Sequence, residues 1–121
     1  MTSFSHAECG TPCQDLRAKV TFACQSAAEA IASGQAADCS VLIVDPPRKG
    51  LEAPVVRELC STTKSSPLRS IRTLIYVSCG FDALERELAE LTTHGWKLQA
   101  AKGYLMFPGS NHIETVAVLK R

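Results

Sequence analysis

The chain has 121 residues, a length that supports one domain with a modest core. Apolar residues make up 45% of the sequence and the formal net charge is only +1, which is typical of a globular domain rather than a disordered chain. Because the overall charge is close to zero, any contact with RNA must depend on local clusters such as Arg48-Lys49. The longest apolar runs have only the length of strands, so we expect no membrane partner.

The cysteines give no sign of a secreted protein. The first ten residues, MTSFSHAECG, lack the apolar segment of a secretory signal. We therefore expect reduced thiols and an intracellular protein, with no preference between the cytoplasm, the nucleus and an organelle. Cys9 and Cys13 have no second pair of cysteines or histidines at ligand spacing, so no metal site is expected. The six cysteines are Cys9, Cys13, Cys24, Cys39, Cys60 and Cys79.

The first half of the chain predicts a strand, a helix and a second strand. The run KVTFAC predicts a short strand over 19–24. Ser26 and Glu29 form a capping-box pattern that opens an alanine-rich helix, and Gly34 stops it. The continuous apolar run VLIVD, residues 41–45, predicts a strand that is covered on both faces, as in a parallel sheet.

The second half continues the alternation. Pro54 begins a helix with one apolar face, and the run IRTLIYVSC, 71–79, predicts a buried strand. A capping pattern that starts at Asp82 opens the next helix. The runs 96–107 and 112–120 predict two strands that the tight turn PGSN joins into an antiparallel pair.

This order of elements predicts an α/β fold. We expect a partial doubly wound, Rossmann-like sheet, mostly parallel, with a C-terminal antiparallel β-hairpin. Residues 20–121 are assigned to this domain, and 1–19 to an N-terminal segment. Ligands of such sheets bind beyond the carboxyl ends of the strands. The segments DPPR and SCGF both follow predicted neighbouring strands, so the functional site is expected there.

Two of the strand ends carry candidate functional side chains. Asp45 precedes Pro46 and Pro47, which hold the loop extended so that the carboxylate can face a planar ligand; the alternative is a simple strand terminator. Cys79 lies just before a predicted helix, whose positive end favours the thiolate. The alternative is a buried structural thiol, which is also what we expect of the other five cysteines.

A third candidate lies at the start of the last predicted strand. Glu114 enters an apolar run, and His112, two residues earlier, shares its face by alternation. A carboxylate in this position can act as a general base. The alternative is a solvated charge at the end of a strand.

The segments VLIVDPPRKGL, IYVSC and FPGSNHIETV occur in this order, and together they resemble the RNA (uracil-5-)-methyltransferase family. Its members typically read D-P-P-R-x-G-L, V-S-C-N-P and D-M-F-P-x-T-x-H-V-E. The resemblance covers about residues 20 to 121 and corresponds to the C-terminal half of the family's class I methyltransferase domain. It implies transfer of a methyl group from S-adenosylmethionine to carbon 5 of uridine in RNA, with tRNA and rRNA both open as partners.

The resemblance also implies a role for each candidate. Cys79 is implied as the nucleophile that adds to carbon 6 of uracil, and Glu114 as the base that removes the proton from carbon 5. Asp45 is implied to face the cofactor and the target base. Such chemistry needs an unstacked base. The residues implied to bind the substrate RNA are Pro46, Arg48 and His112.

The sequence departs from the family pattern at several positions. Gly80 and Phe81 replace the Asn-Pro that follows the nucleophile, and Gly80 is expected to add flexibility there. Leu105 replaces the Asp of the third motif, and Gln25-Ser26 stands where the family usually has Gly-Asp. Residues 1–19 contain no Gly-rich segment for the cofactor. We therefore expect a fragment of a longer enzyme or a truncated relative. We also expect little or no cofactor binding by this chain alone, and a sheet edge that invites self-association.

Two alternative functions stay open. A non-catalytic module would keep the fold and act through RNA or protein contacts, which the Gly80-Phe81 change and the missing cofactor segment favour. Methylation of an exocyclic amino group uses Asp-Pro-Pro followed by an aromatic residue. Here Arg48 follows instead, and that chemistry needs no cysteine.

Overall fold

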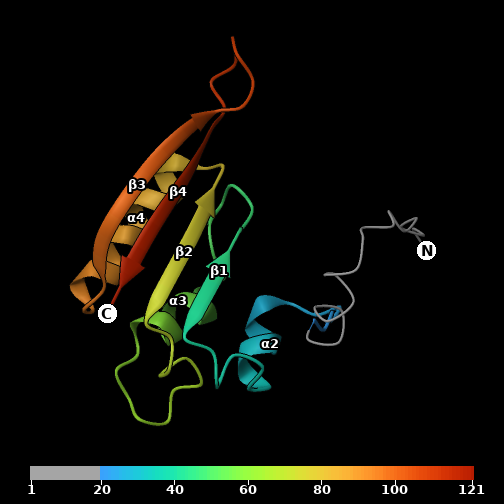
Figure 1. Cartoon of the computed structure of the whole chain (residues 1–121), viewed down its shortest axis with the longest axis vertical. Helices are drawn as coiled ribbons and strands as arrows, with labels where there is room; N and C mark the ends of the chain where they lie inside the picture. Colours follow the sequence, from blue (N-terminus) through green and yellow to red (C-terminus); the bar gives the residue numbers. More distant parts are fainter. Residues whose placement is uncertain (1–19) are drawn as a thin grey trace, which may run out of the picture.

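The computed structural model describes residues 20–121 as a four-stranded sheet with helices packed on one face (Figure 1). The predicted N-terminal segment, with Cys9 and Cys13, lies outside the described residues. Within the part described, no helix has the length and apolar character needed to cross a membrane. The elements are α2 (Ala27–Ala32), β1 (Val41–Val44), α3 (Ala53–Cys60), β2 (Thr73–Ser78), α4 (Phe81–Thr93), β3 (Lys97–Leu105) and β4 (Ile113–Lys120).

The strands lie in the order β1-β2-β4-β3, and the sheet is mixed. β1 and β2 are parallel, with Val41 opposite Thr73. β4 is antiparallel to both of its neighbours, β2 and β3. The α/β class and the C-terminal antiparallel hairpin are therefore confirmed, whereas the prediction of a mostly parallel sheet is wrong. The reason is that β4 returns between β2 and β3, so that it adds two antiparallel pairings.

The structure confirms the predicted cap of α2 but not that of α4. The capping box of α2 is complete: the Glu29 N–H donates to Ser26 Oγ at 3.2 Å, and the Ser26 N–H donates to the Glu29 carboxylate at 2.8 Å. The Ser26 N–H and the Ser26 hydroxyl both donate to the Glu29 carboxylate, and these hydrogen bonds lower the pKa of Glu29. The predicted cap at Asp82 is wrong, because α4 begins at Phe81 and Gly80 is its N-cap.

The strand predicted over 19–24 does not form in the described residues 20–24. Phe22 is 95% exposed, and the sheet holds no strand from this segment. A run of β-branched and aromatic residues becomes a strand only where a neighbour pairs with it and covers one face. Residues 20–24 pair with no strand of the sheet, so their preference for the strand conformation is not enough to form one.

The core lies between the sheet and the helices. Trp96 is 1% exposed and its Nε1–H donates to the Leu59 carbonyl at 2.8 Å. The Arg121 guanidinium lies over the Trp96 ring, 4.5 Å from its centroid, and donates to the carbonyls of residues 59, 68 and 71. The largest side chains that are fully buried are Trp96, Tyr76, Leu59, Leu68, Ile71, Leu74, Leu84, Leu91, Leu119 and Val55.

The other face of the sheet carries no helix among the described residues (Figure 1). Because side chains alternate along a strand, β1 directs Leu42 toward the core while Val41 and Ile43 lie on the uncovered face, 47% and 65% exposed. β1 also pairs only with β2, so within residues 20–121 its second edge has no strand beside it. An exposed sheet edge is thus present as expected.

Candidate active site

The three candidate reactive residues lie at the same end of three adjacent strands. We call this end, where β1 and β2 finish and β4 begins, the carboxyl edge of the sheet. Asp45 directly follows β1, and Cys79 directly follows β2, its parallel neighbour. Glu114 is the second residue of β4, which lies next to β2, and its neighbour Thr115 pairs with Ser78. Cys79 and Glu114 therefore each lie one residue beyond the pair Ser78–Thr115, the last pair between β2 and β4. The prediction that DPPR and SCGF follow neighbouring strands is confirmed.

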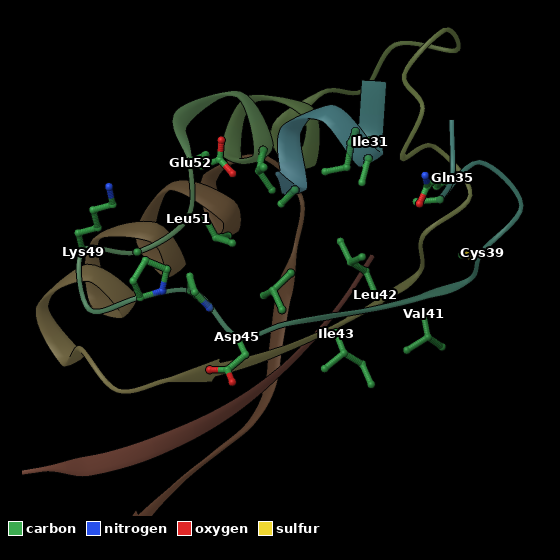
Figure 2. Close-up of a pocket in the computed structure, with 18 residues that line it drawn as sticks. Ile31, Gln35, Cys39, Val41, Leu42, Ile43, Asp45, Lys49, Leu51 and Glu52 are labelled. Atoms are coloured by element: carbon green, nitrogen blue, oxygen red, sulfur yellow. The ribbon is translucent and has the colours of Figure 1, made fainter. Parts of the chain in front are cut away.

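Asp45 and Pro46 belong to a cavity of about 680 Å³ that borders the free edge of β1 (Figure 2). Its walls are largely apolar and come from α2, β1 and the loop 46–52. In Figure 2, Leu42 points toward Ile31 of α2, whereas Asp45 lies on the other side of the strand. The Asp45 carboxylate is thus on the uncovered face of the sheet.

Cys79 lies on a second, smaller cavity of about 380 Å³, between the start of α4 and the β3–β4 hairpin. Its thiol is partly buried, and the cavity is also lined by Phe81, Asn111 and Thr115. Asp45 does not line this cavity. The structure therefore brings Asp45 and Cys79 to the same edge of the sheet without placing them on one cavity. Glu114 is half-buried and pairs with Tyr104 of β3.

Arg48 and His112, 64 positions apart in the sequence, are hydrogen-bonded to each other. Arg48 Nη2 donates to His112 Nδ1 at 2.7 Å, and both side chains are exposed. The bond joins the loop after β1 to the loop that precedes β4. Two residues predicted to bind the substrate thus form one polar cluster at the carboxyl edge of the sheet.

Gly80 has a steric role that the sequence did not reveal. A Cβ built on Gly80 would lie 2.3 Å from the Arg48 carbonyl oxygen, so the Arg48 backbone occupies the space that a side chain would need. The Gly80 N–H also donates to Ser78 Oγ at 3.1 Å, and that hydroxyl donates to the Gly80 carbonyl at 2.9 Å. The expectation that Gly80 adds flexibility does not describe this contact. Its lack of a side chain lets the two loops touch.

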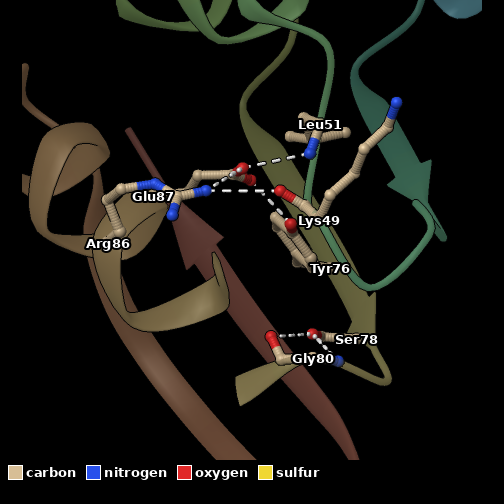
Figure 3. A network of polar contacts seen from close by, with 7 residues as sticks. All are labelled: Lys49, Leu51, Tyr76, Ser78, Gly80, Arg86 and Glu87. Atoms are coloured by element: carbon tan, nitrogen blue, oxygen red, sulfur yellow. Dashed lines mark hydrogen bonds and ion pairs between the residues drawn. The ribbon is translucent and has the colours of Figure 1, made fainter. Parts of the chain in front are cut away.

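A buried carboxylate, Glu87, ties this edge of the sheet to the core (Figure 3). Glu87 is 4% exposed and accepts hydrogen bonds from the Tyr76 hydroxyl at 2.6 Å and from the Leu51 N–H at 3.0 Å. Burial and the contact with Glu87 raise the pKa of Tyr76 above its ordinary value. A Cβ on Gly50 would lie 2.0 Å from a Glu87 oxygen, which packs the loop tightly against α4.

Glu87 was missed in the sequence, although a signal was present. It lies three residues after Leu84 and four before Leu91, on the apolar face of α4. A carboxylate on such a face must be hydrogen-bonded when it is buried.

In residues 20–121, no three His, Cys, Asp or Glu side chains gather as metal ligands.

Comparison with known proteins agrees with these features. Residues 30–121 match the family described as tRNA (Uracil-5-)-methyltransferase. The chain belongs to this family.

Three relatives show how much of such proteins the chain represents. An uncharacterised RNA methyltransferase of Protochlamydia amoebophila is 38% identical over 88% of this chain and 26% of that protein. An uncharacterised RNA methyltransferase of Lactiplantibacillus plantarum is 36% identical over 84% of the chain and 21% of that protein. The 23S rRNA (uracil(1939)-C(5))-methyltransferase RlmD of Chromohalobacter salexigens is 41% identical over 66% of the chain and 15% of that protein. The chain thus spans about a quarter or less of these relatives.

Proposed function

We propose that this chain carries the nucleophile and the base of an S-adenosylmethionine-dependent RNA uracil-5-methyltransferase. The observation that carries the proposal is that Asp45, Cys79 and Glu114 lie at the same end of three adjacent strands, in a chain of this family. Relatives named as RNA methyltransferases support RNA as the substrate, and one of them is named for a uracil of 23S rRNA.

The cavity at the edge of β1 suits one side of the cofactor. Its apolar wall fits the adenosyl group of S-adenosylmethionine, and Asp45 supplies an acidic group for the ammonium or ribose hydroxyls. When bound, S-adenosylmethionine supplies the methyl group that carbon 5 of uracil takes up. Because the second edge of β1 has no strand beside it in residues 20–121, the described residues form only one wall of this site.

Cys79 and Glu114 act in turn on the uracil ring. The Cys79 thiolate adds to carbon 6, and the displaced electron pair makes carbon 5 a nucleophile. After carbon 5 has gained its methyl group, the Glu114 carboxylate removes the remaining proton from that carbon. The electrons of the broken C–H bond restore the double bond between carbons 5 and 6, and the Cys79 thiolate leaves. The pair Arg48–His112 offers positive charge for a phosphate of the RNA.

The test uses RNA that contains 5-fluorouridine, because fluorine at carbon 5 cannot be removed as a proton and the enzyme stays bound to the ring. S-adenosylmethionine is supplied at millimolar concentration because the described residues form only one wall of its site. Under this condition we expect the wild-type chain to form an adduct that survives denaturing electrophoresis. Cys79→Ala should abolish the adduct, whereas Cys39→Ala, at an exposed cysteine, should leave it unchanged. An adduct that survives Cys79→Ala contradicts the assignment of the nucleophile, and no adduct with the wild type contradicts the proposed reaction.

A second candidate is a non-catalytic module that binds RNA or protein. It is favoured by one observation, that Asp45 and Cys79 line different cavities. Alkylation by iodoacetamide at neutral pH, followed by mass spectrometry, separates the two candidates. A nucleophilic Cys79 reacts faster than the exposed Cys39, and a module gives no such difference. Burial raises the pKa of Cys60, so that thiol serves as the slow internal reference.

A further inference from the structure

Large apolar side chains are exposed at the start of α4, just after Cys79, and in the β3–β4 hairpin. Phe81, two residues after Cys79, is 65% exposed, and it is the first residue of α4. Phe107, in the loop between β3 and β4, is 67% exposed. The other exposed large apolar residues of this hairpin are Leu98, Tyr104, Leu105, Met106 and Ile113.

We propose that Phe81 is a stacking surface for one unpaired base of single-stranded RNA, bound in the cavity that Phe81 shares with Cys79. The inference rests on the proposed function for the identity of the partner as RNA. It adds a substrate-binding residue at a position where this chain departs from the family motif, since Phe81 stands where the family has proline.

The packing of the protein does not account for Phe81. The core of residues 20–121 closes without it, and its ring forms one wall of the cavity of about 380 Å³. This volume is near the lower end of the range for small-molecule pockets, roughly 300–1,000 Å³, and suits a single nucleoside. Every nucleobase has a flat π-face, so an exposed aromatic ring can stack on it whatever its identity.

The other groups on the cavity suit the polar parts of a nucleotide. Asn111 and Thr115 line it and can donate to or accept from the edge of a base. Lys102 also lines it, with Nζ 5.2 Å from the centroid of the Tyr104 ring. Arg48, whose backbone contacts Gly80, carries a second cation on the neighbouring loop. Aromatic rings interleaved with cations are typical of surfaces that bind single-stranded RNA.

The test measures binding of a fluorescein-labelled ten-nucleotide uridine RNA to the 121-residue chain by fluorescence anisotropy. We expect Phe81→Ala to raise the dissociation constant about 5- to 150-fold, which is the loss of one stacked base. Phe81→Trp should bind within about threefold of the wild type, and Phe81→Leu, apolar but without a π-face, should bind as weakly as the alanine variant. Phe22→Ala is the matched control, since Phe22 is also exposed but does not line the cavity that contains Cys79.

Several outcomes would overturn the inference. They are no measurable binding by the wild type, equal binding by Phe81→Ala and the wild type, or equal binding by Phe81→Leu and Phe81→Trp. If Phe81→Ala leaves RNA binding intact and shifts sedimentation toward the monomer, the ring serves contacts between copies instead. The failure of the proposed reaction is recognised separately, because it concerns the covalent adduct: binding can depend on Phe81 with no adduct, and an adduct can form with no such dependence.

Discussion

Aromatic and polar side chains are buried in the helix-covered core but exposed at the carboxyl edge of the sheet. In the core, Trp96 is 1% exposed and its N–H has a partner, and no buried side-chain nitrogen or oxygen in residues 20–121 lacks one. At the carboxyl edge, Phe81 is 65% exposed, and the Arg48 guanidinium is hydrogen-bonded to another exposed side chain, His112. The core therefore supplies the stability of the domain, whereas these side chains of the carboxyl edge stay accessible to solvent.

Glu87 joins these two regions. Its carboxylate is buried against Tyr76 of the core, and it holds the backbone of the loop that follows Asp45 and Arg48. The loop that carries candidate binding residues is therefore attached to the rigid part of the molecule, although its own side chains are exposed. Substitutions in the core, at the contact between loops and in this network should differ in size accordingly.

The largest effect is expected from Trp96→Ala. The substitution removes a fully buried ring, its hydrogen bond to Leu59 and the surface on which Arg121 lies, so the free energy of unfolding should fall by about 3–5 kcal/mol. Urea denaturation followed by circular dichroism measures this loss. Phe22→Ala, at a 95% exposed ring, should change it by less than about 0.5 kcal/mol. Equal losses for the two variants would contradict the assignment of the stability to the core.

A smaller effect is expected where the two loops touch. In Gly80→Ala the new methyl group would meet the Arg48 carbonyl oxygen, a backbone atom that cannot turn aside, and the loss should be about 1–3 kcal/mol. Gly103→Ala is the matched control, since its nearest atom is a side-chain methyl of Ile113 at 3.2 Å. Urea denaturation of both variants checks this. If Gly80→Ala is as stable as Gly103→Ala, the carboxyl edge is looser than the contact indicates.

The smallest effect is expected from Tyr76→Phe, and it should depend on pH. Near neutral pH, loss of the hydroxyl that donates to Glu87 should lower the free energy of unfolding by about 1 kcal/mol. The pKa of Tyr76 is raised in the folded state above its ordinary value of 10.0, mainly by burial. Its contribution is therefore complete below pH 10.0 and is lost as the pH rises toward the folded pKa. Denaturation of both proteins from pH 7 to 11 should show the gap between them narrowing above about pH 10; a constant gap would contradict this.

Much of the candidate site could be predicted because each motif is a local feature. The apolar runs that end at Asp45 and Cys79 mark strand ends, and adjacent parallel strands in an α/β sheet bring such ends to one edge. Glu114 was placed near the start of the last strand, which begins at Ile113. The roles of these residues and the self-association of the β1 edge remain predictions.

What lay beyond the sequence depends on contacts between distant segments. The insertion of β4 between β2 and β3 is a pairing choice that strand patterns do not encode, and it makes the sheet mostly antiparallel. The run at 19–24 has the composition of a strand, yet residues 20–24 pair with no strand of the sheet.

The family, the α/β class, the capped start of α2 and the strand ends that carry Asp45 and Cys79 could all be predicted, because they depend on motifs and on neighbours a few residues apart. Three features became visible only in the fold: Gly80 accommodates the Arg48 backbone, Glu87 anchors the loop beside the site, and Asp45 and Cys79 line different cavities. Steric contact and burial join segments that are 30 or more positions apart, and no local pattern specifies them.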